Sequence, residues 1–320
     1  MKIGLFTALF QDRPLEKVVD YCAQMGIGAV ELGTGGYPGS AHANLAEIGD
    51  DAAKANALKK TVESRGLIIS AFSCHGNPVH PDKEFARMSD EAFRKTVLLA
   101  ERLEIPVVIT FSGCPGDSPT GKYPNWVTCP WPPDFLTVLN YQWNEVLIPY
   151  WTKAEEFARA HGVKVALEMH PGMAVYNTET ALKLRAATGP NLGVNFDPSH
   201  LFWQGIDPVA SVRSLGDAVF HVHAKDTKID PLNSSVNGVL DTKPYGQEIK
   251  RSWIFRSVGY GHDYGFWKDL VSNLRLVGYD YVLSIEHEDS LMSTGEGLRK
   301  AVETLKACII EEKPGPMFWA

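Results

Sequence analysis

Four side chains that can hold a metal ion follow four successive apolar segments in the second half of the chain. They are Glu168, Asp197, His223 and Glu286, at intervals of 29, 26 and 63 residues. Three carboxylates brought together would repel one another strongly unless a cation lay between them. Three carboxylate oxygens and one imidazole nitrogen suit a hard or borderline divalent cation. The residues therefore predict a site for one divalent metal ion, with Mn²⁺ expected first and Mg²⁺, Co²⁺ or Zn²⁺ as alternatives.

The stretch from Asn195 to His200 indicates how one of these side chains is positioned. It follows the apolar run 191–194, which is typical of a buried strand, and Pro198 cannot extend a strand ladder. We expect the strand to end at Asp197, with the His200 imidazole three residues later. Taken alone, Asp-Pro-Ser is as typical of an Asx turn. The agreement among four segments favours a functional site.

Further polar side chains follow the ends of the same predicted strands or lie in the segments after them. Histidine, lysine and arginine can donate hydrogen bonds to sugar oxygens. Surface decoration or a structural hydrogen bond is the alternative for each one taken alone. We expect the following residues to bind substrate: His75, His170, His200, Lys225 and Arg256.

Strand-like and helical segments alternate along the chain. Near-continuous apolar strands between helices predict a parallel sheet covered by helices. Eight such pairs predict a closed (β/α)₈ TIM barrel of a single domain over residues 1–312, with a C-terminal tail at 313–320. A doubly wound sheet is the rival, but Gly33–Pro38 lacks the third glycine of a nucleotide fingerprint. The strands are expected at 2–9, 29–32, 67–73, 106–111, 163–168, 191–197, 218–223 and 281–286.

One helix and two long loops between these strands have predicted bounds. Ser89 and Asp90 are expected to start the helix that ends at Leu103. The segments 112–133 and 224–262 are expected to be long loops. Loops of this length are usually functional, so we expect both to cover the mouth of the barrel.

Composition narrows the class of protein. The 320 residues carry 31 lysines and arginines against 38 aspartates and glutamates, a net charge of −7. An acidic balance argues against a nucleic-acid partner, and no apolar run is long enough to span a membrane. Five cysteines without a Cys-x-x-Cys pair indicate no disulfide framework, which fits a cytoplasmic location. A homo-oligomer is compatible with the two long segments, which offer surfaces to a partner subunit.

Five motifs carry a resemblance to a known family: Ala166-Leu167-Glu168, Asp197-Pro198-Ser199-His200, His221-Val222-His223-Ala224-Lys225-Asp226, Gly259-Tyr260-Gly261 and Ser284-Ile285-Glu286. With them the sequence resembles the xylose isomerase-like TIM-barrel superfamily, in its sugar phosphate isomerase/epimerase branch, over essentially the whole chain. The resemblance implies that the four residues named first are the metal ligands. It also implies that Glu168 and Glu286 are the acid–base pair and that His200 contacts substrate.

The resemblance implies a metal-dependent isomerase or epimerase that acts on a small sugar or keto-sugar. Glu168 and Glu286 would remove and return a proton next to the carbonyl group, through an enediolate. Loss of a β-leaving group from the same enediolate would instead give a lyase or dehydratase on a keto-sugar or keto-inositol. A protein that binds a sugar without catalysing a reaction is the third alternative.

The superfamily also holds abasic-site endonucleases, which use three zinc ions and additional ligands. His75 and His200 match two of these ligands. The histidine expected after the fourth strand is missing, since Phe111-Ser112-Gly113 stands there, and an Asp-x-His motif is missing from the long segment after His223. We therefore expect one metal ion and no nucleic-acid substrate.

Overall fold

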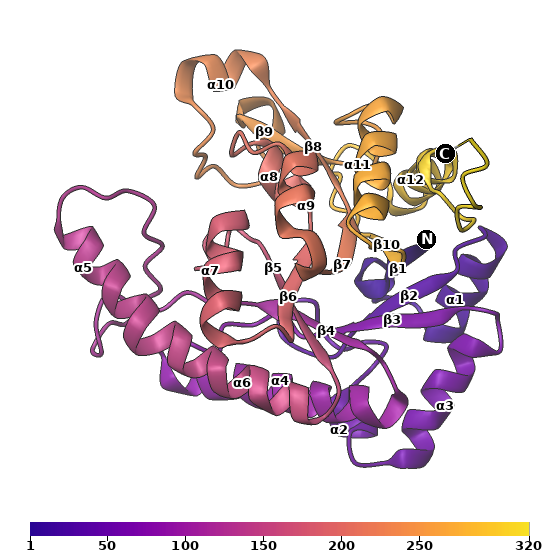
Figure 1. Ribbon diagram of the computed structural model, residues 1–320, viewed down its shortest axis with the longest axis horizontal. Coiled ribbons are helices and arrows are strands. Elements are labelled where there is room, and N and C mark those ends of the chain that lie inside the picture. The colour runs from indigo at the N-terminus through magenta and orange to yellow at the C-terminus, as the bar shows by residue number, and fades with distance from the viewer. Residues whose placement is uncertain (320) are drawn as a thin grey trace.

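Eight parallel strands close into one barrel in the computed structural model, which describes residues 1–319. Around the barrel the order is β1, β10, β7, β6, β5, β4, β3 and β2, and β2 returns to β1. Strands that follow one another among these eight are therefore also neighbours in space. The predicted (β/α)₈ fold is confirmed (Figure 1). The strands are β1 (Lys2–Phe6), β2 (Ala29–Gly33), β3 (Ile68–Ser73), β4 (Val107–Phe111), β5 (Lys164–Glu168), β6 (Leu192–Phe196), β7 (Val219–Ala224) and β10 (Val282–Ile285).

Helices cover the outside of the barrel, and most begin at a capping side chain. The long helix α4 begins at Lys83, six residues before the predicted start, because the Asp82 carboxylate accepts hydrogen bonds from the backbone N–H groups of Glu84 and Phe85. None of the helices within residues 1–319 is long and apolar enough to cross a bilayer. The main helices are α1 (Leu15–Gln24), α3 (Ala52–Glu63), α4 (Lys83–Leu103), α6 (Ile148–Ala160), α7 (Thr178–Thr188), α9 (Pro208–Leu215), α11 (Tyr264–Leu276) and α12 (Thr294–Cys308).

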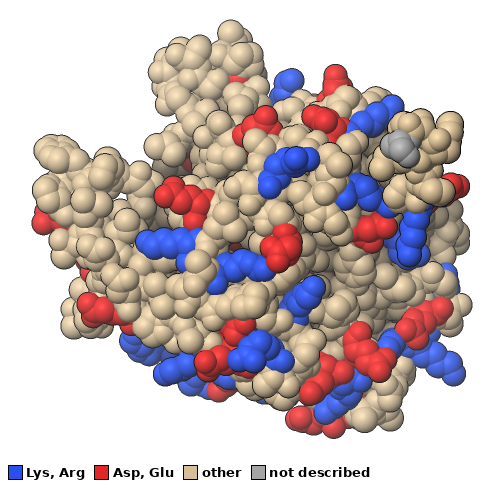
Figure 2. Space-filling model, in the orientation of Figure 1, with Lys and Arg blue, Asp and Glu red and all other residues tan. Residues whose placement is uncertain are grey.

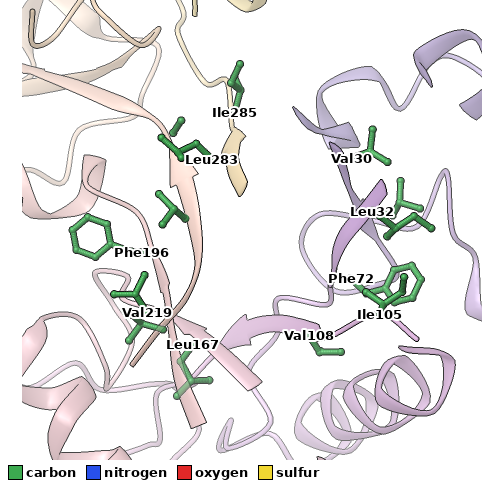
Figure 3. Packing of buried hydrophobic residues seen from close by; sticks show 14 of the residues in the cluster. Val30, Leu32, Phe72, Ile105, Val108, Leu167, Phe196, Val219, Leu283 and Ile285 are labelled. Atoms are coloured by element: carbon green, nitrogen blue, oxygen red, sulfur yellow. The ribbon is translucent and has the colours of Figure 1, made fainter. Parts of the chain in front are cut away.

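The alternation of side chains along each strand separates the hydrophobic core from the polar centre. Val30 and Leu32 of β2 and Leu167 of β5 belong to the main core cluster between strands and helices (Figure 3). Glu31 and Glu168 lie on the opposite faces of these strands, toward the barrel axis. A smaller cluster closes the lower part of the barrel interior, formed by Ala71, Val107, Ile109, Ala166 and Phe220.

The segment 224–262 is not the loop that the sequence suggested. It forms an arm in which β8 (Asp226–Ile229) pairs with β9 (Trp253–Arg256) as an antiparallel ladder, with α10 (Pro231–Asn237) at its tip. Asp226 Oδ2 accepts hydrogen bonds from the backbone N–H groups of Gly259, Gly261 and His262, which joins the two ends of the arm. Trp253 and Phe255 of β9 supply the strand propensity of this ladder.

Trp253 also anchors the arm to the barrel, because its ring stacks on that of Trp203 at 4.9 Å. The arm around α10 and the region around α5 (Asp134–Tyr141) stand out from the body as two lobes. In Figure 2 these lobes are almost free of charged side chains, whereas Lys, Arg, Asp and Glu are intermixed over the helical body. Residues 112–133 form no helix or strand, as predicted.

Close packing of β6 against β7 gives a test of the barrel. A Cβ atom on Gly193 would lie 2.6 Å from the Phe220 ring and would also meet the backbone of Ala218. We expect Gly193→Ala to lower the free energy of unfolding by about 1–3 kcal/mol, the usual effect of overpacking, in a urea titration. Gly295→Ala is the matched control, because a Cβ there meets nothing within 4 Å. Equal stability of the two variants would contradict this packing.

Candidate active site

The four side chains expected to hold a metal ion converge at the carboxyl ends of the strands. Glu168 ends β5, His223 lies in β7, and Asp197 and Glu286 each follow the last residue of a strand. One nitrogen or oxygen atom from each lies within 4.8 Å of the others. Asp197 and His223 are fully buried and Glu168 nearly so. The barrel topology therefore brings together residues that are more than a hundred positions apart in sequence.

Three atoms of this cluster are buried without a hydrogen-bond partner among residues 1–319. They are Asp197 Oδ2, His223 Nδ1 and Glu286 Oε2. A buried polar atom left unsatisfied costs about 1–3 kcal/mol, and more when it is charged. Three such atoms around one point, with a Glu168 carboxylate beside them, form the donor set that a divalent cation takes. The residues present fit one such ion.

Glu31 orients His223 from the opposite side, and the sequence did not single it out. His223 Nε2 lies 3.0 Å from Glu31 Oε2 and donates to this carboxylate, which leaves Nδ1 facing the cluster. Glu31 is fully buried and also accepts hydrogen bonds from Ser73 and from Ser284 at 2.8 Å. A carboxylate behind the distal nitrogen is the common support of a metal-binding histidine. The sequence feature that could have indicated Glu31 is a charged residue inside the otherwise apolar run Ala29–Leu32.

Glu168 is held by three donors. His75 Nε2 donates to its Oε2 at 2.9 Å, and Asn195 Nδ2 donates to the same atom at 3.0 Å. His200 Nε2 lies 3.3 Å from its Oε1. Burial raises the pKa of Glu168, but the neighbouring histidines, with His75 foremost, outweigh burial and hold the pKa well below its usual range. Glu168 is therefore a carboxylate in a fixed orientation.

Asn195 and His221 form a relay beneath Glu168 that sequence reasoning also missed. His221 Nδ1 lies 3.0 Å from Asn195 Oδ1, and its Nε2 lies 3.2 Å from Ser70 Oγ. Burial lowers the pKa of His221 to about 4 despite the nearby Glu31. The imidazole is neutral, so its Nδ1–H donates to the Asn195 oxygen and turns the amide N–H₂ toward Glu168.

Glu286 has a different environment from Glu168. Its Oε2 lies 3.3 Å from Lys225 Nζ, and the same ammonium lies 2.5 Å from Glu288 Oε2. Burial opposes the charge on Lys225, yet Glu286 and Glu288 raise the pKa of Lys225 well above its usual value. Burial raises the pKa of Glu286, but Lys225 and His223 outweigh burial and hold the pKa of this carboxyl below its usual value. One charged lysine thus compensates two glutamates on the cavity wall.

His200 and His170 lie edge to face with ring centroids 4.2 Å apart, but their charges differ. Burial lowers the pKa of His200, whereas Asp197, 3.2 Å away, and Glu168 raise it to about 9 overall. Burial, together with the neighbouring His200 charge, lowers the pKa of His170 to about 3. His200 is therefore a cationic donor toward the cluster, and His170 is a neutral ring.

A cavity of about 580 Å³ opens onto this cluster, and we call it the main chamber. Its lining includes both glutamates and most of the residues expected to bind substrate. Arg256 is an exception and a correction, because it does not line the chamber and instead pairs with Asp289 at 3.1 Å. His200 lies behind the wall, in contact with Glu168. The predicted residues that line the chamber are His75, Glu168, His170, Lys225 and Glu286.

The two long segments differ in their relation to this site. Phe255 of the arm lies 4.2 Å from Lys225 Nζ, and Tyr245 and Phe255 line a second cavity beside the main chamber. Of residues 112–133, none lines either of these cavities. Instead, Trp126 of that segment packs against Tyr176, and Gln142 donates to the carbonyl oxygens of Pro115 and Asn125. Residues 112–133 thus contribute no side chain to the walls of these two cavities, and their covering of the mouth stays a prediction.

A family profile described as xylose isomerase-like TIM barrel matches residues 19–308. The chain belongs to this family. The resemblance carried by the five sequence motifs is thereby confirmed. The uncharacterized protein YfiH of Bacillus subtilis is 40% identical over 312 residues, covering 97% of this chain and 99% of YfiH. A shorter match of 100 residues, 33% identical, is to the inosose dehydratase of Clostridium botulinum and covers 31% of this chain and 33% of that enzyme.

Solved structures of the family share the fold at low sequence identity. The 3-DHS dehydratase AsbF of Bacillus anthracis aligns with a TM-score of 0.66 at 20% identity, covering 96% of this chain and 99% of AsbF. The IOLI protein, solved with a bound zinc atom, gives 0.65 at 18% and covers 96% and 98%. A D-psicose 3-epimerase from Clostridium cellulolyticum, solved with D-tagatose, gives 0.63 at 12% and covers 96% and 97%.

The convergent donor atoms make metal binding directly testable. We expect the protein dialysed against Mn²⁺ to retain one ion per chain by elemental analysis. His223→Ala removes the imidazole nitrogen and should weaken Mn²⁺ binding by at least about 100-fold in calorimetry. His161→Ala is the matched control, since His161 pairs with Glu101 near the surface. No ion in the wild type, or three ions per chain, would contradict a single site.

The contact between Glu31 and His223 gives a second prediction. Glu31→Gln keeps an acceptor oxygen but removes the charge that supports the imidazole. We expect a loss of Mn²⁺ affinity of about 10–100-fold, the usual effect of removing such a supporting group, with unchanged circular dichroism. Glu47→Gln on α2 (Leu45–Ile48), outside the centre, should bind Mn²⁺ like the wild type. Wild-type affinity in Glu31→Gln would show that Glu31 only fills the barrel.

Proposed function

We propose that the protein is a divalent-metal-dependent isomerase or epimerase that acts on a small sugar by proton abstraction next to a carbonyl group. The observation that carries this proposal is the convergence of Asp197, His223 and Glu286, each with a buried atom that makes no hydrogen bond, beside Glu168 at the base of the main chamber. The bound ion would supply the Lewis acid that makes the carbon next to the carbonyl more acidic. Mn²⁺ is the proposed ion, and the donor set also accepts Mg²⁺, Co²⁺ or Zn²⁺.

Glu168 and Glu286 are the proposed bases. Both line the main chamber, and one oxygen of each lies within 3.3 Å of His223 Nδ1, so the two carboxylates flank the same point. One carboxylate takes the proton from the sugar carbon, and the other carboxyl group returns a proton. Return to the opposite face of the same carbon gives an epimer, and delivery to the adjacent carbon gives an aldose–ketose pair. Fixed positions spare the reorientation of both groups.

Cationic donors next to the two bases support this chemistry. Lys225 lines the main chamber, and His200 lies beside Glu168 and Asp197. Both carry charge at neutral pH, since the pKa of His200 is raised to about 9 and that of Lys225 well above its usual value. Lys225 is placed to stabilise the negative charge that develops on a sugar oxygen when the proton leaves, and His200 holds Glu168 and Asp197 from behind the wall. His75 fixes Glu168 from the opposite side.

A dehydratase is the second candidate. Proton abstraction by one carboxylate, followed by departure of a β-hydroxyl group, needs the same metal ion and only one base. The match to inosose dehydratase and the fold shared with the dehydratase AsbF support it. The presence of two glutamates next to His223 Nδ1 favours isomerisation, since elimination leaves the second without a necessary role as a base.

Two further classes fit less well. An abasic-site endonuclease needs an open, basic surface, whereas Lys225 is the one lysine or arginine among the described residues that line the main chamber, and two glutamates pair with it. A sugar-binding protein without catalysis has no use for two buried carboxylates that flank a metal site. Solvent-deuterium exchange into a sugar C–H bond would separate enzyme from binding protein.

Substitution of each glutamate tests the two-base mechanism. Glu168→Gln and Glu286→Gln keep an oxygen for the metal ion but cannot accept a proton. We expect kcat to fall about 10²–10⁴-fold in each, the usual contribution of a general base, with a smaller change in substrate binding. In an epimerase one variant should retain deuterium exchange without inversion, and the other should lose both. Glu303→Gln on the exposed face of α12 is the control.

The same pair of variants separates the two candidates. A dehydratase needs one base, so one of the two metal-saturated variants would eliminate at nearly the wild-type rate. Near-normal turnover in both would remove the two-base mechanism. The substrate screen is a panel of ketoses, keto-inositols and 3-keto-glycosides with Mn²⁺, followed by NMR in deuterium oxide, in which product mass separates isomerisation from loss of water.

A further inference from the structure

A second cavity of about 430 Å³ adjoins the main chamber, and we call it the side chamber. The two chambers share His170 and Glu288 in their linings. The other walls of the side chamber come mainly from the arm, through Tyr245, Ile254 and Phe255, and from Ser290 after β10. A cavity that holds a small ligand usually measures roughly 300–1,000 Å³. The side chamber is thus large enough to hold a ring of its own.

Aromatic rings form one wall of the side chamber. Tyr245 stacks on Phe255 with ring centroids 5.7 Å apart and planes 22° apart. The buried guanidinium of Arg251 lies 4.4 Å from the Tyr245 ring and donates to the Trp253 carbonyl oxygen, which fixes its place. Tyr245 is nevertheless 59% exposed. An aromatic ring held by fixed neighbours and open to solvent is a preorganised surface for a flat or apolar group.

The charges of both chambers limit the kind of ligand. Among the described residues that line them, Lys225 is the one lysine or arginine. Its ammonium group pairs with Glu286 and Glu288. An anionic group in the side chamber would meet Glu288 without a lysine or arginine of the lining to pair with. A phosphorylated substrate is therefore disfavoured. His170 adds an imidazole ring at the junction of the two chambers.

We propose that the side chamber binds the second ring of a neutral glycoside whose reacting ring, a keto-sugar, lies in the main chamber against Glu168 and Glu286. This inference rests on the proposed function, since it places the reacting sugar at those two carboxylates. A free monosaccharide would leave the Tyr245 ring exposed to water. A glycoside with an aromatic or second sugar ring would cover it while His170 and Glu288 line the passage between the two rings.

Paired ligands that differ only in the second ring test this proposal. Calorimetry on the Mn²⁺-loaded protein would compare phenyl and methyl β-glycosides of glucose, galactose and xylose. We expect at least one phenyl glycoside to bind about tenfold more tightly than its methyl counterpart, the scale of one good aromatic contact. Tyr245→Ala should abolish this preference and leave methyl-glycoside and Mn²⁺ binding unchanged. Tyr123→Ala is the matched control, because Tyr123 is 80% exposed and lines neither chamber.

The outcomes separate this proposal from the proposed function. Equal binding of phenyl and methyl glycosides, or no binding of either, overturns the side chamber as a binding site. A phenyl preference that survives Tyr245→Ala also overturns it. A protein that binds Mn²⁺ and exchanges deuterium but shows no phenyl preference loses the side chamber alone. A Tyr245-dependent phenyl preference in a protein without Mn²⁺ binding supports the side chamber and removes the metal-dependent mechanism.

Discussion

A single buried imidazole connects the interior of the barrel to the acidic centre. His223 donates from Nε2 to Glu31 on one side and presents Nδ1 to Glu168 and Glu286 on the other. Burial disfavours its charged form, yet the surrounding glutamates raise the pKa of His223 well above its usual value. A proton on Nδ1 balances the carboxylates when no cation does, and a cation that binds there must release it.

The two glutamates that flank the centre differ in their surroundings. Glu168 is almost fully buried and accepts from His75, Asn195 and His200. Glu286 is partly exposed and meets Lys225, a buried side chain that Glu288 also contacts. One base is thus held by imidazole and amide donors, and the other by an ammonium group. The asymmetry is a property of the donors around the carboxylates and cannot be seen in the glutamates alone.

Residues that end a parallel strand could be found from the sequence, because a polar side chain after an apolar run marks both the strand and its edge. Glu168, Asp197, His223 and Glu286 were placed in this way. The role of Glu31 was not predicted, because a charged residue inside a strand does not indicate its partner, which lies 192 positions away. Asn195 and His221 were not predicted, because their role in orienting Glu168 depends on hydrogen bonds that only the structure shows. Arg256 was misplaced because its position in a motif says nothing of Asp289, with which it pairs.

Length alone misled the reading of the two long segments. Residues 112–133 are irregular but pack against neighbouring helices, while 224–262 contains a ladder, since Trp253 and Phe255 alternate with Ile254 and Arg256 as strand residues do. The start of α4 was missed for a local reason. Asp82, Ser89 and Asp90 are all residue types that cap helices well. Which of them starts α4 depends on the path of the preceding loop.

The closed base of the arm gives it the character of an interchangeable module. The β8–β9 ladder and the three backbone bonds to Asp226 fix where the chain leaves the barrel and where it returns. Residues 231–250 between these fixed points can then lengthen, shorten or change in composition while the positions of His223 and Glu286 stay the same. Drift in this stretch would reshape the surroundings of Tyr245 without cost to the chemistry. Substrate range and catalysis can evolve separately in such a barrel.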